Sequence, residues 1–226
     1  MTKKAKSILI LTYIIFSISL FAVVLIVAPF REVFKKLSSE IPYLMGFIKF
    51  SLLATAGELI AVAIKQKEFK LPAKIIWRFL IWGLIGMWIT FMMKVYSVAV
   101  SSMMETGLLL GGANKFLKAL YTSVIMNTTF GITFMAIHKI TDKILELAQE
   151  KQKITLNSVI LGIDWSGFWG FTILKTVPLF WIPMHTVTFL LPAEYQVMMA
   201  AGLSVALGVI LSFSSKSKQR EKKQCQ

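Results

Sequence analysis

The sequence predicts an all-α fold, a polytopic bundle of about six transmembrane helices with both termini in the cytoplasm. The first reason is composition: 56% of the 226 residues are hydrophobic and only 16% are charged, whereas soluble domains usually contain about 25% charged residues. A chain of this length cannot bury so much apolar surface inside itself. The second reason is that the apolar residues form long runs with charges gathered between them, as in proteins that cross a membrane several times.

Each expected helix is an apolar segment close to the length needed to cross a bilayer, which is about 20 residues. The six segments are residues 7–29, 43–64, 75–99, 117–138, 160–187 and 194–214. The first exceeds the apolar core of a cleaved signal peptide, so we expect it to remain as a membrane helix. The polar stretch from Lys139 to Asn157 is expected to prolong the fourth helix and then form a loop.

These segments divide the chain into three parts. We expect an N-terminal membrane helix with its connecting segment over residues 1–42, a helical membrane domain over 43–215 and a basic cytoplasmic tail over 216–226. The tail contains Cys225, the single cysteine of the chain. We therefore expect neither an internal disulfide nor a cysteine-based metal site.

The distribution of charge predicts the orientation. With the N-terminus in the cytoplasm, most of the 25 Lys and Arg residues fall in cytoplasmic segments, as the positive-inside rule requires. The net charge of +14 is thereby explained by membrane topology. We expect membrane lipids as partners and no nucleic acid, and the sequence leaves a homo-oligomer open.

Ionisable side chains inside apolar spans are costly, by roughly 2.5–3.5 kcal/mol each, so their positions are informative. Glu58 and Arg78 lie at similar depths in the second and third spans and are expected to pair, either to fix helix register or to contact a solute. Lys175 lies roughly 16 Å along the fifth span from Asp164. It is expected to meet a polar group inside the bundle or to line a wet cavity. Lys49 is expected to extend to the membrane surface.

Uncharged polar residues complete the set of candidate buried or pore-lining groups. The full set is Glu58, Arg78, Asn127, Lys175, His185 and Thr188. Small residues also recur four apart and so share one face of a helix. These stripes are Ala119, Ser123, Asn127 and Gly131; Gly162, Ser166 and Gly170; and Ala200, Ser204, Gly208 and Ser212. Because close approach of backbones drives association in lipid, we expect a closely packed bundle.

No pattern of catalytic residues is present. The chain has no Gly-rich phosphate loop and no G-x-S-x-G nucleophile motif. His138 and His185 lack the spacing to other ligands that a metal site requires. We therefore expect no enzyme activity, no cofactor and no metal.

The stretch LFWIPMHTVTFLLPAEY, residues 179–195, is mostly apolar yet interrupted by prolines. Proline removes a backbone donor and kinks a helix, so Pro178 and Pro183 are expected to kink the outer end of the fifth span. The hydroxyls of Thr186 and Thr188 are expected to satisfy the freed carbonyls, and Pro192 to end the helix. The kinked segment could be a shape-setting hairpin or a gating hinge.

This stretch resembles the C-terminal hallmark of the Mpv-seventeen/peroxisomal membrane protein family. Trp181 stands in the Trp place, Pro183 near the Pro place, His185 in the Gln place and Thr188 in the Asn place, while Phe189 matches and Pro192 comes one residue early. Upstream, Gly57-Glu58 resembles the family's Gly-Asp, and Arg78 its basic residue before a glycine-bearing span with Gly83 and Gly86. Tyr96 resembles the aromatic residue that closes that span. The chain departs from the family's usual four spans by one or two additional helices.

The resemblance implies a membrane protein more firmly than a particular activity. Weakly selective channel activity has been proposed for some members of the family, so a small-solute channel is our first hypothesis. The alternatives are a non-conducting membrane organiser that binds lipid or partner proteins, and a coupled secondary transporter. Residues 126–142 resemble bacterial-type relatives, which favours a multi-pass protein of a bacterial cytoplasmic membrane.

Overall fold

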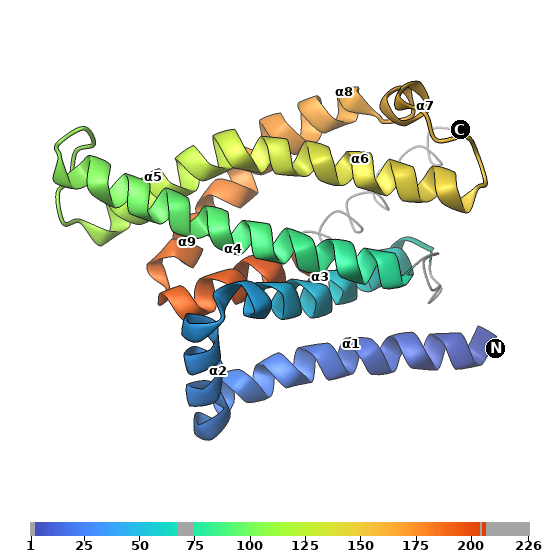
Figure 1. Cartoon of the computed structure of the whole chain (residues 1–226), viewed down its shortest axis with the longest axis horizontal. Helices are drawn as coiled ribbons and strands as arrows, with labels where there is room; N and C mark the ends of the chain where they lie inside the picture. Colours follow the sequence, from blue (N-terminus) through green and yellow to red (C-terminus); the bar gives the residue numbers. More distant parts are fainter. Residues whose placement is uncertain (1–2, 67–74, 204, 207–226) are drawn as a thin grey trace, which may run out of the picture. The chain divides into compact units, whose positions relative to one another are not determined.

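A computed structural model describes residues 3–66, 75–203, 205 and 206. Every regular element with defined bounds in this part of the chain is a helix. The helices are α1 (Lys3–Ile26), α2 (Ala28–Glu40), α3 (Pro42–Gln66), α4 (Ile75–Glu105), α5 (Lys115–Met126), η1 (Asn127–Gly131), α6 (Ile132–Gln149), α7 (Leu156–Leu161), α8 (Trp165–Gly167), η2 (Phe168–Trp181) and α9 (Ile182–Leu190) (Figure 1). Residues 193–203 are also helical. The segments η1 and η2 are π-helices.

Within the described residues, five helical stretches are long and apolar enough to cross a membrane, which confirms the predicted all-α fold and marks the chain as a membrane-embedded protein. They are Ser7–Ile26, Pro42–Ile64, Ile75–Glu105, Lys115–Gln149 and Trp165–Leu190. The expected prolongation of the fourth span is present, because α6 continues to Gln149 before the chain leaves the helix. The sixth expected span, residues 194–214, lies in part outside the described residues.

The chain divides into two compact units, one formed by Met1–Thr90 with Glu194–Gln226 and the other by Phe91–Ala193. In the first unit, α2 runs across between the ends of α1 and α3 (Figure 1). A single residue separates α2 from each neighbour, Val27 on one side and Ile41 on the other. Pro29 lies in the first turn of α2, where its missing N–H has no helical partner to lose.

Helix α1 packs on α3 through a small apolar cluster and one tyrosine. The buried residues of the cluster are Ile10, Ile14, Ala56 and Leu59. The hydroxyl of Tyr13 lies 3.1 Å from the backbone carbonyls of both Ser51 and Leu52. This contact satisfies a polar group that would otherwise be exposed to hydrocarbon.

Glycines bring α3 close to its neighbours in the first unit. A Cβ atom on Gly46 would lie 2.8 Å from the carbonyl oxygen of Gly86 on α4, and one on Gly57 would lie 2.8 Å from Cα of Val205. A Cβ on Gly83 would meet the ring of Phe47. The three glycines named by the family resemblance, Gly57, Gly83 and Gly86, therefore all lie where another helix approaches closely, as small-residue packing in lipid requires.

In the second unit, α5 packs against α9. Ala119, Ser123 and Asn127 are buried along one face of this helix, so the first small-residue stripe is a packing face. The stripe of Gly162, Ser166 and Gly170 is not, because all three residues are exposed. The reason is that α7 ends at Leu161 and a new helix begins at Trp165. The Asp164 carboxylate caps this new helix by accepting from the Gly167 N–H at 2.8 Å. Of the third stripe, only Ala200 lies within the described residues, and it is buried.

Of the prolines in the fifth span, one lies inside the π-helix η2 and one lies at the start of the α-helix that follows it. Pro178 lies inside η2, and Pro183 lies at the start of α9. The expected role of the threonines is wrong: the Thr186 hydroxyl donates to the carbonyl of Ile182 at 2.8 Å and the Thr188 hydroxyl to that of Met184 at 2.9 Å. Each threonine thus donates to the carbonyl four residues before it, as threonine commonly does within a helix. Neither hydroxyl reaches a carbonyl that proline leaves unpaired.

Helix α9 ends as expected. Leu191 is extended, Pro192 is not helical, and the next helix begins at residue 193. Because Pro192 constrains the residue before it to an extended conformation, the helix cannot continue through Leu191. Pro192 therefore ends the fifth span and starts the turn into the last helix.

Candidate functional site

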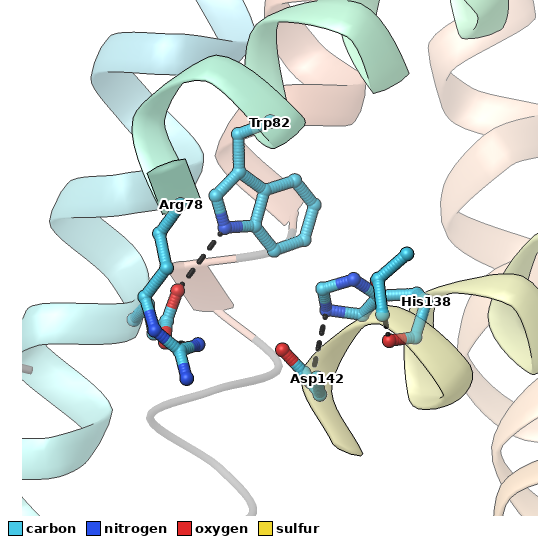
Figure 2. Close-up of polar contacts among 6 residues, drawn as sticks. Arg78, Trp82, His138 and Asp142 are labelled. Atoms are coloured by element: carbon cyan, nitrogen blue, oxygen red, sulfur yellow. Dashed lines mark hydrogen bonds and ion pairs between the residues drawn. The ribbon is translucent and has the colours of Figure 1, made fainter. Parts of the chain in front are cut away.

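The first unit contains a partly buried ion pair between α3 and α4. The guanidinium of Arg78 bonds one carboxylate oxygen of Glu58, and the indole N–H of Trp82 donates to the other at 3.2 Å. Figure 2 shows Arg78 and Trp82 turned to the same carboxylate. The two donors are four residues apart and so share one face of α4, and the side chains of Glu58 and Arg78 are only 20% and 17% exposed.

This arrangement brings the expected pair of Glu58 and Arg78 together. It also adds Trp82 as a second partner of Glu58, which the sequence did not suggest. Both carboxylate oxygens of Glu58 are engaged by groups of α4. A charge held in this way satisfies the requirement that intramembrane ionisable groups find partners. A shift of one helical turn between α3 and α4 would separate all three groups, so the cluster fixes their register.

A second charged site of the first unit surrounds Lys49, which is 2% exposed. Its ammonium group donates to the Ser38 hydroxyl at 2.9 Å and to the backbone carbonyl of Glu194 at 3.0 Å, and it lies 4.4 Å from the ring centroid of Phe34. The ring of Phe34 in turn stacks on Tyr195 with centroids 5.9 Å apart. The ammonium group thus finds two oxygen acceptors and an aromatic face.

The expectation that Lys49 extends to the membrane surface is wrong. Helix α2 lies across the end of α3 and supplies Phe34 and Ser38, while the start of the last helix supplies Glu194, 145 residues away in sequence. These elements enclose the side chain before it can reach water. Sequence spacing missed this site because its acceptors are a hydroxyl and a backbone carbonyl, which carry no recognisable pattern. The one signal that could have indicated it is the four-residue spacing of Phe34 and Ser38, which places both on one face of a helix.

In the second unit, α5, η1 and α9 share a buried polar network. The Asn127 side-chain oxygen lies 3.0 Å from Nδ1 of His185, and its amide nitrogen donates to the carbonyl of Ser123 at 2.7 Å and to its hydroxyl at 3.3 Å. The Ser123 hydroxyl donates to the carbonyl of Ile182 at 2.7 Å. The network therefore joins α5 to α9 through Ser123 and Ile182, and η1 to α9 through Asn127 and His185.

The network determines which nitrogen of His185 carries the proton. A backbone carbonyl can only accept, so the Ser123 carbonyl requires the nitrogen of the Asn127 amide on its side. The oxygen of that amide must then face His185, and it too can only accept. Nδ1 of His185 is therefore the donor, and when the ring is neutral Nε2 keeps its lone pair.

Aromatic and hydroxyl groups surround this network. Trp181 stacks on His185 with ring centroids 5.3 Å apart, and Phe189 is half-buried on the same helix. The hydroxyl of Tyr96 lies 2.8 Å from that of Thr129, which itself donates to the carbonyl of Ile125. Tyr96 is consequently the donor to Thr129 and is attached to η1 within the second unit.

Thr188 and Lys175, the other two predicted site residues, show no hydrogen bond or ion pair to the Asn127–His185 network in the part of the chain that the structure describes. Thr188 is fully buried, but its hydroxyl bonds only the backbone of α9. Lys175 is exposed on η2, and no ion pair or hydrogen bond to it is found among the described residues. His138 lies 3.5 Å from the carboxylate of Asp142, one turn further along α6 (Figure 2).

Comparison with known proteins adds no relative: no protein-family model, curated protein or solved structure matches the chain. The function must therefore be inferred from the geometry of these residues. It brings Glu58 to Arg78 in one unit and Asn127 to His185 in the other, and it makes Lys49 a third, unexpected polar centre.

Proposed function

We propose that this protein is a non-conducting membrane organiser, a helical bundle without catalytic activity that binds membrane lipids or partner proteins. The observation that carries the proposal is that the polar side chains of three centres are each engaged by partners inside the protein. Glu58 is held by Arg78 and Trp82, Lys49 by Ser38 and Glu194, and Asn127 by Ser123 and His185. These side chains lock helices together.

A conducting path would need the same groups to be available to a solute. Breaking a buried ion pair typically costs about 3–5 kcal/mol, and freeing a buried hydrogen-bonded group about 1–3 kcal/mol. A passing solute would have to replace each lost contact. These costs favour a structure in which the buried groups remain paired, and this supports a non-conducting protein over a channel.

A second candidate is the weakly selective small-solute channel suggested by the family resemblance. One observation favours it: the ammonium group of Lys175 is exposed within the span Trp165–Leu190, where an unpaired charge is costly in lipid. A wet passage would remove that cost. The π-helix that carries Lys175 agrees with this candidate, because such segments often lie at functional sites.

Membership of the Mpv-seventeen/peroxisomal membrane protein family and residence in a bacterial cytoplasmic membrane complete the proposal. Both rest on the residue pattern around Trp181, Pro183 and Phe189 and on the bacterial-type segment 126–142. A reporter fused to the C-terminus of the chain tests the orientation. A cytoplasmic reporter agrees with the expected orientation, in which both termini lie in the cytoplasm, and a periplasmic reporter contradicts that orientation.

Flux through purified protein in proteoliposomes distinguishes the two candidates. The test compares ions, sugars and nucleotides across vesicles that contain wild type, Lys175→Ala or the matched control Lys153→Ala, whose lysine is exposed in a polar loop. The organiser predicts no flux from any of the three folded proteins, with phospholipid retained after mild extraction. Flux that Lys175→Ala changes and Lys153→Ala leaves unchanged would establish the channel instead.

A further inference from the structure

Helix α2 has three distinct faces. Phe34 and Ser38, four residues apart, are buried in the first unit. The opposite face is polar and carries Glu32, Lys35, Lys36, Ser39 and Glu40. Between them lies an apolar face that is exposed: Phe30 and Val33 are each 56% exposed and Leu37 is 36% exposed. Residues three and four apart share a face of a helix, so these three side chains form one continuous stripe.

The connections to α2 place this stripe at the edge of the membrane. Helix α2 follows one membrane-crossing helix after a single residue and precedes the next after a single residue. It also runs across the ends of α1 and α3 (Figure 1). A helix tied in this way to the same ends of two spans cannot cross the bilayer itself and must lie along its surface.

The spans on either side of α2 also carry exposed apolar residues at the ends that α2 joins. Ile26, the last residue of α1, is 78% exposed, and Leu44 in the first turn of α3 is 53% exposed. Both belong to the membrane-crossing stretches Ser7–Ile26 and Pro42–Ile64. The apolar residues of α2 therefore extend this lipid-facing surface sideways at the level where the hydrocarbon ends.

We propose that α2 is an interfacial helix that inserts Phe30, Val33 and Leu37 into the boundary between phospholipid headgroups and acyl chains, with its charged face in water. Such helices combine an apolar face with a strongly polar one and lie in the plane of the interface. The occupant of the stripe is thus the bilayer. The assignment goes beyond the proposed function, because it holds for an organiser and for a channel alike.

The charges of α2 indicate which lipid chemistry it prefers. Lys35 lies 2.9 Å and Arg31 3.9 Å from the carboxylate of Glu32, and Lys36 lies 4.0 Å from that of Glu40. The hydrogen bond to Glu32 raises the pKa of Lys35, because the carboxylate favours the charged ammonium group. Since most of its positive charge is balanced within the helix, α2 has little attraction left for anionic headgroups. Burial of the apolar stripe supplies the binding energy, and neutral phospholipid suffices.

Spin labels on the two faces of α2 test this inference in the full-length protein. In a Cys225→Ser background, a nitroxide is attached at Val33→Cys on the apolar stripe or at Ser39→Cys on the polar face, the matched control. Both side chains are exposed, so neither substitution opens a cavity. Collision with oxygen, which concentrates in lipid, is compared with collision with a water-soluble nickel chelate, in vesicles of phosphatidylcholine alone and with added phosphatidylglycerol.

The expected result is a reversal between the two labels. The label at residue 33 collides more with oxygen and the label at residue 39 more with the chelate, to the same extent in both lipid mixtures. Equal chelate access at the two positions would overturn the inference, because the stripe would then lie in water. Low access to both reagents at residue 33, with or without spin–spin broadening, would also overturn it, since a partner protein or second copy would cover the stripe. Insertion only with phosphatidylglycerol would overturn the preference for neutral lipid.

Discussion

Asn127 and His185 are 58 residues apart in sequence, yet the side-chain oxygen of the first lies 3.0 Å from Nδ1 of the second. Their contact joins η1 to α9, and the bonds of Asn127 to Ser123 prevent the amide from turning over. The hydrogen bonds thus run in one direction, from His185 to Asn127, from Asn127 to the Ser123 hydroxyl, and from that hydroxyl to the carbonyl of Ile182. Buried networks of this kind specify one arrangement of helices when every member is satisfied.

The first prediction concerns the proton on His185. Nitrogen NMR of protein labelled in its histidines is expected to show His185 as the Nδ1–H tautomer with an unprotonated Nε2. Replacing Asn127 with Ala removes the acceptor, so the ring should lose this fixed tautomer. The free energy of unfolding should also fall by about 1–3 kcal/mol, because the Nδ1–H of His185 loses its acceptor in a buried network.

A matched control separates this network from ordinary threonine bonds in the same unit. Thr128→Ala removes a hydroxyl that is exposed and bonds only its own helix, so both the tautomer and the stability should remain close to wild type. An Nε2–H tautomer in wild-type protein would contradict the assigned direction of the whole chain of bonds.

The second prediction concerns the Glu58–Arg78 pair. Glu58→Gln removes the carboxylate charge that the guanidinium of Arg78 bonds in a largely buried site, and we expect a loss of about 1.5–3 kcal/mol in the free energy of unfolding. The double variant Glu58→Gln/Arg78→Gln should recover part of this loss, because the guanidinium that has lost this carboxylate is then removed as well. Thermal unfolding in detergent micelles measures both.

The exposed pair of Lys36 and Glu40 on α2 supplies the control. Surface ion pairs contribute about 0–1 kcal/mol, so Glu40→Gln should change stability by less than Glu58→Gln. Equal effects of the two substitutions would show that the Glu58–Arg78 pair is no more important to stability than a pair in water.

The sequence predicts the helical fold and the spans well because both depend on the length and polarity of contiguous segments. It also predicts the Glu58–Arg78 pair, since depth along two adjacent spans can be counted from their ends. Trp82 could be recognised only after the pair was known, from its position one turn beyond Arg78.

The burial of a side chain by helices that are distant in sequence cannot be deduced from residue spacing within one span. Lys49 was expected to reach the surface, but α2 and the start of the last helix cover it. The stripe of Gly162, Ser166 and Gly170 failed for a local reason, because Asp164 caps a new helix and changes the face that the later residues present. The partners of Thr186 and Thr188 were wrong because a threonine within a helix bonds its own backbone before it reaches elsewhere.

The third prediction concerns Lys49 as a tie between α2, α3 and the last helix. Lys49→Met keeps the apolar stem but leaves the Glu194 carbonyl and the Ser38 hydroxyl without their donor. We expect faster amide hydrogen exchange at residues 193–203 together with α2. Lys36→Met, at an exposed position of α2, should leave exchange unchanged. Unchanged protection in Lys49→Met would show that apolar packing alone holds the last helix.

The fourth prediction concerns the close approach of α3 and α4 at Gly46. Alanine at this position would place its Cβ 2.8 Å from the carbonyl of Gly86 and against the side chain of Thr90, so the helices must move apart. Overpacking of this kind typically costs about 1–3 kcal/mol, and separation would also weaken the neighbouring contact of Ser51 with the Phe79 carbonyl.

Gly170→Ala is the control, because nothing lies within 4 Å of its added Cβ. Unfolding midpoints should fall for Gly46→Ala and hold or rise for Gly170→Ala, since alanine is the better helix former. Equal midpoints would mean that α3 and α4 adjust freely, and the glycine contact would then have no role in setting their spacing.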